Sequence, residues 1–424
     1  MAGKRVTAVS EILSPLLPAF LVLTVCAAIY YIAVCIAALS FLRDRTRSRS
    51  SKKHLDVELP PISILKPVAG ADPGFYENIR RHAQQEYPNF ELLFGAADSN
   101  DPALEAIGRL AREFPHLRIE AFVCECSRPG NHKVQRLERL EREARFEFLL
   151  VNDSDIRVER SYLRDVVQPF LDPETGARVG LVSCPYRARP GAALASLTEA
   201  LTVSAEFQGQ ILLSRLLKQV DFALGATMLF RRRDLERSGG FRALVPYLAD
   251  DYRLGNRIQK LGLDLVISTH AVEIVLGADR WREAWRRQLR WSRTIRACRP
   301  GGHFGLLFTQ ASLWSMLCLA AAAASGSSAI LMAVPSAALL LRLFAAWLVG
   351  WRCLGSPVVA SRLYWMFVAD GLAVAAWCGS FFTRRVYWRN RLLQIGRDGR
   401  IAGEFPVASN EPRPVRAGHH TSRS

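Results

Sequence analysis

The sequence of 424 residues predicts an α/β domain attached to membrane-spanning helices at both its amino and carboxyl sides. Three observations predict this fold class: an uncharged apolar run near the start, alternating strand-like and helix-like segments across the middle, and further apolar runs towards the end. Half of the residues are hydrophobic, which is high for a purely soluble protein, and the excess is concentrated in these runs.

The first apolar run reaches from Leu16 to Leu42 without a charged residue. A helix needs roughly 20 such residues to cross a bilayer. A cleavable signal peptide is the alternative, but its apolar region is only about 7–15 residues long. We therefore predict an uncleaved transmembrane anchor over residues 1–43.

The formal net charge of +17 could indicate a nucleic-acid partner, so the location of the charge matters. Directly after the anchor, "RDRTRSRSSKK" carries six Lys or Arg and one Asp, whereas only Lys4 and Arg5 precede the anchor. A Lys/Arg excess marks the cytoplasmic flank of a membrane helix and attracts anionic lipid headgroups. We expect a basic linker over 44–60, a cytosolic domain after it, and no nucleic-acid partner.

Nine cysteines are scattered along the chain, and Cys124 and Cys126 are the nearest pair. No CxxC motif or histidine-rich partner accompanies them, which argues against a zinc site and for reduced thiols.

The middle of the chain, residues 61–276, alternates strands with helices. The expected strands are "ISILKPV", "FELLFGAAD", "LRIEAFV", "FEFLLVND" and "VGLVSCPY", and the expected helices are Phe75–Gln85, Pro102–Phe114, Lys133–Ala144 and Tyr162–Phe170. This alternation predicts a mainly parallel sheet covered on both faces. In such sheets ligands bind beyond the carboxyl ends of the strands.

Acidic residues stand at two of these strand ends. Asp153 and Asp155 follow the apolar run "FLLV", and Asp98 follows "ELLFGAA". An Asp-x-Asp turn can hold Mg²⁺ or Mn²⁺, which prefer oxygen ligands and are often bound by one or two carboxylates plus substrate phosphates. The alternative is an ordinary turn or helix cap, because Asp favours both.

Two further segments carry candidate site residues. Asp250 and Asp251 begin an expected helix, where an N-cap is the simpler interpretation, but two adjacent acids exceed what a cap needs and one could act as a general base. Upstream, Gly225, Ala226 and Thr227 are small enough for close approach of a ligand, although a plain tight turn would also explain them.

The last part of the chain returns to the membrane. Residues 277–302 form a basic helix with Trp281 and Trp285 on one face, typical of the membrane interface. Three apolar stretches at about 304–324, 329–350 and 358–382 predict membrane segments within 303–383. Three crossings would place the basic tail, 384–424, outside, against the positive-inside tendency. We expect a cytosolic tail and leave the number of crossings open.

The order of these motifs resembles a known enzyme class. Asp98, Asp153-x-Asp155, Asp251 and Arg287-x-x-Arg290-Trp291 resemble the series found in inverting, membrane-bound family 2-like glycosyltransferases. More narrowly, "ISILKPVAGADP", "AADSNDPA", "NDSDIRV", "YLADDYRLG" and "RQLRWSRTIR" are similar to the ceramide glucosyltransferase family (family 21), which includes bacterial relatives that glycosylate hopanoids. The resemblance covers nearly the whole chain.

The resemblance implies a GT-A, Rossmann-like domain, a UDP-sugar donor, a Mg²⁺ or Mn²⁺ cofactor and a membrane-lipid acceptor. It assigns Asp251 as the catalytic base and Asp153 and Asp155 as metal ligands. It implies that the donor contacts Lys66, Asp98, Lys133, Asp153, Asp155 and Gly225, and that Asp250, Arg287, Arg290 and Trp291 border the acceptor and the diphosphate. Where the family has an Asn-x-Lys-x-Asn-Asn stretch, this chain reads Asn131-His132-Lys133-Val134-Gln135-Arg136, so Lys133 is kept but acceptor specificity stays open.

The implied function is transfer of one sugar, glucose or N-acetylglucosamine, to a hopanoid or ceramide hydroxyl by a UDP-sugar-dependent hexosyltransferase. The Ala/Arg-rich composition favours a multi-pass protein of a bacterial inner membrane and the hopanoid acceptor. One alternative is a processive polysaccharide synthase with the same aspartates. Another is a non-catalytic basic scaffold, for which only the charge argues.

Overall fold

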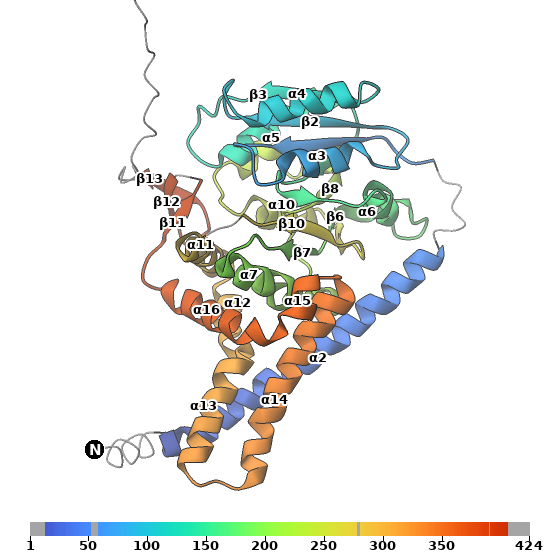
Figure 1. Ribbon diagram of the computed structural model, residues 1–424. Coiled ribbons are helices and arrows are strands. Elements are labelled where there is room, and N and C mark those ends of the chain that lie inside the picture. The colour runs from blue at the N-terminus through green and yellow to red at the C-terminus, as the bar shows by residue number, and fades with distance from the viewer. Residues whose placement is uncertain (1–12, 52–57, 278–279, 390, 406–424) are drawn as a thin grey trace, which may run out of the picture.

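The computed structural model describes residues 13–51, 58–277, 280–389 and 391–405 (Figure 1). The start of the expected anchor with Lys4 and Arg5, part of the expected linker with Lys52 and Lys53, and tail residues 406–424 lie outside the described residues. An α/β domain occupies one end of the molecule and a group of long apolar helices the other (Figure 1).

A seven-stranded sheet forms the centre of the α/β domain. Its order is β3-β2-β1-β4-β8-β6-β9. The strands are β1 (Ile62–Pro67), β2 (Phe90–Ala96), β3 (Arg118–Val123), β4 (Phe148–Val151), β6 (Val179–Ser183), β8 (Met228–Arg231) and β9 (Asp264–Ile267). Only β8 runs against its neighbours β4 and β6. The predicted, mainly parallel sheet is therefore confirmed, and β1 and β2 are buried along their whole length, as strands covered on both faces must be.

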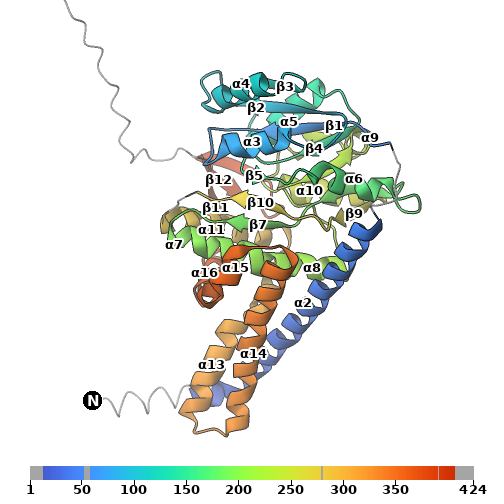
Figure 2. The same cartoon turned by 45° about the vertical axis from the view of Figure 1, so that its right-hand side comes forward.

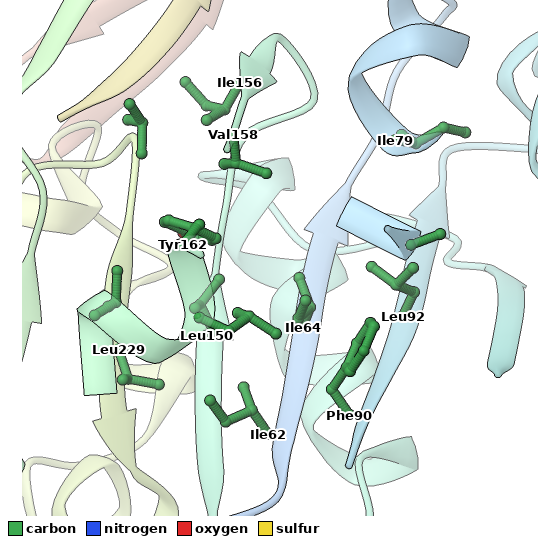
Figure 3. Packing of buried hydrophobic residues seen from close by; sticks show 14 of the residues in the cluster. Ile62, Ile64, Ile79, Phe90, Leu92, Leu150, Ile156, Val158, Tyr162 and Leu229 are labelled. Atoms are coloured by element: carbon green, nitrogen blue, oxygen red, sulfur yellow. The ribbon is translucent and has the colours of Figure 1, made fainter. Parts of the chain in front are cut away.

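Helices cover both faces of this sheet. One face carries α3 (Phe75–Ala83), α4 (Ala103–Glu113) and α6 (Tyr162–Leu171), and the other carries α5 (His132–Glu143), α9 (Arg232–Arg237) and α10 (Asp250–Lys260). Figure 3 shows the first face, where Ile62, Ile64 and Leu92 of the strands meet Ile79 and Tyr162 of the helices. Because side chains alternate along a strand, Leu65 and Leu93 point into the opposite core.

A second layer connects the domain to the apolar helices. A small sheet has the order β5-β10-β7, formed by β5 (Ile156–Arg157), β7 (Tyr186–Arg189) and β10 (Val272–Val275). Strand β7 is followed in the chain by α7 (Leu194–Leu201), the π-helical segment η3 (Thr202–Phe207) and α8 (Gln208–Leu216). Figure 2 shows α7 and α8 between the sheets and the apolar helices.

The segment expected to form the amino-terminal anchor is a helix, α2 (Leu17–Ser51), which also includes the first residues of the expected linker. Helical residues Ser14–Arg47 are long and apolar enough to cross a membrane. The basic end of α2 is held in place: Arg45 Nη1 donates to the Cys353 carbonyl at 2.6 Å, and Asp44 pairs with Arg215 at 2.8 Å.

The carboxyl-terminal part of the described chain contains one helix that meets the same criterion, Ala329–Cys353, made of α14 (Ala329–Trp347) and the π-helical η6 (Leu348–Cys353). A bent pair, Pro300–Thr309 with α13 (Ala311–Ala324), counts as another if it is one span, with a bend of 44°. Both views show α2, α13 and α14 extending together from the domain (Figures 1 and 2).

The third apolar stretch does not form a long helix. It is divided into α15 (Pro357–Ser361), η7 (Leu363–Trp365) and α16 (Met366–Gly379), and the helical run Leu363–Gly379 is shorter than a span. This run packs beside α7 and α11 (Trp281–Cys298), where Trp365 Nε1 donates to Thr198 Oγ1 at 2.9 Å. The expected helix over 277–302 is thus present as α11, packed on its neighbours, with Trp281 exposed.

The tail adds an element that the sequence analysis did not predict. Its order is β11-β12-β13, an antiparallel sheet of β11 (Arg385–Trp388), β12 (Arg391–Ile395) and β13 (Ile401–Phe405). Val386, Leu393 and Ile395 pack on Leu248 of the α/β domain. The described tail therefore packs on the domain, so any membrane segments between the two must return the chain to the side on which the domain lies.

Candidate active site

The acidic turn after β4 is fixed by buried hydrogen bonds. Asn152 is fully buried, and its Nδ2 donates to the Ala226 carbonyl at 2.8 Å. Lys66 Nζ donates to Asn152 Oδ1 and, at 2.9 Å, to the Asp153 carbonyl. Ser154 Oγ donates to Asp72 Oδ2 at 2.6 Å. These bonds hold the turn that carries Asp153 and Asp155 in one conformation.

Lys66, a predicted donor contact, lies beneath this turn with its side chain fully buried. Burial lowers the pKa of Lys66 to about 7, against the attraction of Asp153 and Asp155. The hydrogen bonds that its Nζ donates to Asn152 and Asp153 thus support the acidic turn from inside the domain.

Lys133 connects the two acidic segments of the site. Its Nζ lies 2.8 Å from Asp153 Oδ1 and 3.5 Å from Asp250 Oδ2. Burial lowers the pKa of Lys133, but the attraction of Asp153 and Asp250 outweighs this and raises it, so the ammonium stays charged. The turn after β4 and the start of α10 are therefore brought together across one lysine.

Asp155 lies in an environment with excess negative charge. Burial, Asp153 and Asp72 raise the pKa of its carboxyl group to about 7, while Arg389 opposes the shift. Such repulsion is what a divalent cation would relieve, and carboxylate oxygens are the ligands that Mg²⁺ prefers. Within the described residues no three His, Cys, Asp or Glu side chains form a closed metal cluster. Asp153 and Asp155 fit a cation that takes its other ligands from water and phosphate.

The start of α10 presents Asp250 and Asp251. Asp250 accepts a hydrogen bond from Asn131 Nδ2 at 3.3 Å, and Asn131 in turn caps α5 by accepting from the Val134 amide at 3.2 Å. Burial and then the neighbouring Asp250 raise the pKa of Asp251 to about 6, although Lys133 lowers it. A carboxylate with this pKa is mostly ionised at neutral pH and basic enough to accept a proton.

Gly225 approaches Asp251 closely. Its amide donates to Asp251 Oδ2 at 3.1 Å, and a Cβ at this position would lie 2.9 Å from the same oxygen. Gly225 reaches the site because the following strand, β8, is antiparallel, so that its amino end lies at the carboxyl edge of the parallel strands. Gly225 lies in the loop before β8, and its close neighbour there is the carboxylate of Asp251.

The three residues of the Arg-x-x-Arg-Trp motif lie on α11 and differ in their surroundings. Arg287 donates from Nε and Nη2 to both carboxylate oxygens of Glu199, at 2.7 and 2.5 Å. Burial, followed by repulsion from Arg287, lowers the pKa of Arg290 to about 10, while Glu199 and Asp251 oppose the shift. The Arg290 guanidinium lies 6.0 Å from the Trp291 ring. Arg290 is thus within electrostatic range of Asp251, and Arg287 is held by Glu199.

Asp98 stands apart from these groups. It is exposed after the end of β2 and accepts from the Asn100 amide at 2.8 Å. No hydrogen bond or ion pair joins it to the other predicted site residues in the part of the chain that the structure describes. β2 lies two strand positions from β4, a separation of roughly 10 Å along the same edge.

Three residues at the site were missed by the sequence analysis: Asp72, Tyr186 and Glu199. Burial, followed by the charges of Asp251, Asp153 and Asp155, raises the pKa of Tyr186, so its hydroxyl lies within electrostatic range of these carboxylates. Tyr186 and Asp72 follow strands β6 and β1, so a search of every strand end for polar residues could have found them. Glu199 carries no such signal, because it lies inside a helix and its partner is distant in sequence.

The chain matches the family described as Glycosyl transferase family 21 over residues 21–401. It is 28% identical over 236 residues to Ceramide glucosyltransferase 3 of Caenorhabditis elegans, covering 55% of this chain and 50% of the relative. To Ceramide glucosyltransferase 1 of the same organism it is 28% identical over 222 residues, covering 52% and 46%. The chain thus spans about half of the length of these relatives.

Among solved structures, the chain is similar to the mannosyltransferase PcManGT from Pyrobaculum calidifontis in complex with GDP-Man and Mn²⁺. Identity is 22% and the TM-score 0.47, covering 85% of this chain and 99% of that one. For TarS 1–349 of S. aureus in complex with UDP-GlcNAc, identity is 14% and the TM-score 0.36, covering 82% and 99%.

Proposed function

The chain belongs to glycosyl transferase family 21, and from this premise we propose that it transfers one sugar, glucose or N-acetylglucosamine, from a UDP-sugar to the hydroxyl of a membrane lipid. The acceptor is a hopanoid or a ceramide. The observation that carries the proposal is the ion pairing of Lys133 with both Asp153 and Asp250, beside Asp251. This pairing joins the proposed cation-binding turn, Asp153–Asp155, to the start of α10, which carries the candidate base Asp251. Both lie at one edge of a domain that is attached to apolar helices.

The proposed donor site lies at the acidic turn of a GT-A type domain. Asp153 and Asp155 would hold Mg²⁺ or Mn²⁺, which neutralises the charge that develops on a leaving diphosphate. Lys133 and Arg290 add fixed positive charge at the same place. Asp98 contacts the nucleotide farther along the edge, and Gly225, whose amide donates to Asp251, borders the sugar. Lys66 acts by positioning the turn.

Asp251 is the proposed general base. A lipid hydroxyl is a poor acid, so a carboxylate must take its proton as the new bond forms, and such catalysis contributes about 10²–10⁴-fold. The hydrogen bonds from the amides of Gly225 (3.1 Å) and Tyr252 (2.7 Å) orient this carboxylate. Attack on the sugar from the face opposite UDP inverts its anomeric configuration.

The apolar helices explain how an insoluble acceptor reaches the base. The lipid diffuses laterally in the bilayer and presents its polar end to the domain, near Trp291. Trp291 packs with Ala200 of α7 in the layer that joins the site to the apolar helices. We propose a multi-pass protein of a bacterial inner membrane with the domain in the cytosol, because the Lys/Arg-rich segment follows the first crossing.

The test is to incubate membranes that contain the protein with Mg²⁺ or Mn²⁺, extracted lipids and, in turn, UDP-glucose, UDP-galactose or UDP-N-acetylglucosamine. Mass spectrometry should detect a lipid that carries one hexose or one N-acetylhexosamine. Asp251→Asn should abolish the product while binding of UDP is retained. A polymer instead of a glycolipid would support the processive synthase, and an active Asp251→Asn enzyme would remove Asp251 as the base.

A further inference from the structure

We propose that Arg389, the residue that follows β11, binds the diphosphate of the sugar nucleotide at the donor site. This inference rests on the proposed function and adds to it a binding residue from the carboxyl-terminal tail. The tail lies far from the α/β domain in sequence, and none of the sequence motifs of the site includes it.

Arg389 reaches the loop that supports the acidic turn. Its Nη1 donates to the Ala69 carbonyl at 3.3 Å, across 320 residues of sequence. Ala69 follows β1, in the same loop as Asp72, and Asp72 accepts the hydrogen bond from Ser154 between the two predicted metal ligands. The guanidinium therefore lies beside the segment where the cation and the phosphates are expected.

The charge of Arg389 acts on both sides of the donor site. Burial raises the pKa of Asp155, and Arg389 acts in the opposite direction. Burial lowers the pKa of Arg290, and Arg389 adds to this effect by repulsion. One guanidinium is thus within electrostatic range of a metal-binding carboxylate and of the motif arginine on α11. A diphosphate placed between Arg389 and Arg290 would relieve the repulsion between these two cations.

The hairpin that carries Arg389 is fixed on the domain. Arg391 Nη1 donates to the Gly130 carbonyl at 3.2 Å, in the loop before α5, and its Nε and Nη2 both donate to Glu404 at 2.5 Å. At the other end of the β11-β12-β13 sheet, the Leu248 amide donates to the Gly399 carbonyl at 3.4 Å. Leu248 stands just before Asp250, so the sheet borders the same edge of the domain as the site. Arg389 is exposed at the tip of this anchored hairpin.

The backbone at Arg389 is unusual for an arginine. Its φ is +44°, in the left-handed region, and β11 and β12 pair up to Trp388 and Arg391. A position with positive φ favours Gly, Asn or Asp, which adopt this conformation at least energetic cost. The turn alone would be served better by those residues. Arginine adds a planar guanidinium that binds phosphate oxygens at two points.

The experiment measures nucleotide binding to the full chain in detergent with Mg²⁺, by calorimetry, for UDP and for UMP. Arg389→Asn keeps a residue suited to the turn and should weaken UDP binding about tenfold or more, because one charge-assisted contact is lost. UMP lacks the second phosphate, so its affinity should change less than UDP's. Arg389→Lys, which keeps the charge, should recover part of the UDP affinity.

Arg397→Asn is the matched control, since Arg397 is an exposed arginine in the connection between β12 and β13. It should bind UDP like the wild type. Equal UDP affinity in Arg389→Asn and wild type, equal losses for UDP and UMP, or the same loss in Arg397→Asn would overturn the inference. If the wild type makes the glycolipid while Arg389→Asn binds UDP normally, only this inference fails. If the wild type neither binds UDP nor makes a product, the proposed function fails with it.

Discussion

Arg287 and Glu199 form an ion pair with two hydrogen bonds between α11 and α7, and the Glu199 side chain is fully buried. The pair fixes the helix that carries Arg290 against the helix that leads into η3. We therefore expect Arg287, held by Glu199, to act as a positioning residue for Arg290 on the next turn of α11.

Replacing Glu199 with Gln should disturb this arrangement. The substitution keeps the shape of the side chain but removes the carboxylate charge that pairs with Arg287 next to Arg290. We expect a loss of about 1–3 kcal/mol in the free energy of unfolding. We also expect kcat/KM for the donor to fall by about tenfold or more, because Arg290 is no longer held in place. Thermal unfolding and initial rates measure the two effects. Glu77→Gln, at an exposed position of α3, is the control and should leave both unchanged.

The pH dependence of the rate should report the ionisation of Asp251. Burial and Asp250 disfavour its charged form and raise its pKa to about 6. A general base works only when deprotonated, so kcat/KM should be constant above that pH. It should fall about tenfold per pH unit below it, as protons occupy the carboxylate. A profile measured at saturating Mg²⁺ between about pH 4.5 and 8, chosen to bracket that value, tests this. A rate that stays constant down to the acidic end of that range would contradict the assignment.

Gly225→Ala should impair catalysis more than stability. The added Cβ would lie 2.9 Å from Asp251 Oδ2, which forces the carboxylate to move. A displacement of about 1 Å at a reacting group can lower the rate about 10²-fold. Gly108→Ala is the matched control, because its Cβ would meet only the end of the Arg112 side chain, at 3.7 Å. That variant should keep full activity and be slightly more stable, since alanine favours a helix. Equal rates for the two variants would show that the close approach at Gly225 has no catalytic importance.

The apolar helices contain a buried ion pair that should be essential to their packing. Arg342 of α14 donates to both oxygens of Asp370 on α16, at 3.1 and 2.6 Å, and its side chain is 1% exposed. Arg342→Met removes one partner and leaves the other charge buried, which should destabilise the protein by about 3–5 kcal/mol. The double variant Arg342→Met with Asp370→Leu removes both charges and should recover much of the loss. Thermal unfolding in detergent compares the three proteins, and a double variant no more stable than the single one would refute this account.

Most of the sheet and the acidic site could be predicted from the sequence because their signals are local. The strand β4 is a short apolar run, and Asp153 and Asp155 follow it directly, so strand and site were identified together. Asp250 and Asp251 were found in the same way, at the start of a helix with clear periodicity. The common carboxyl edge of the parallel strands then brings these acids together without further information.

The features that were missed depend on contacts between distant segments. Glu199 acquires its role only when α7 meets α11, and the antiparallel direction of β8 follows from its place between β4 and β6. The last apolar stretch was expected to be a membrane segment, with the number of crossings left open. Its longest helical run is shorter than a span, its Asp370 pairs with Arg342, and its helix packs beside α11. The alternation of residues around "GRDG" is only a weak signal for the tail sheet. The many arginines in this segment obscure the alternation of polar and apolar residues that indicates a strand.

The contact of Val386, Leu393 and Ile395 with Leu248 has a practical consequence for anyone who prepares this protein. After β9 and β10 the chain continues through α11 to the apolar helices α13 and α14, and it returns to the α/β domain with the tail sheet β11-β12-β13. A polypeptide truncated before α13 would lack the β11-β12-β13 sheet, which packs on the α/β domain beside the candidate active site. Biochemistry on such a fragment would therefore describe an incomplete enzyme, and nanodiscs or micelles holding the intact polypeptide are the suitable starting material.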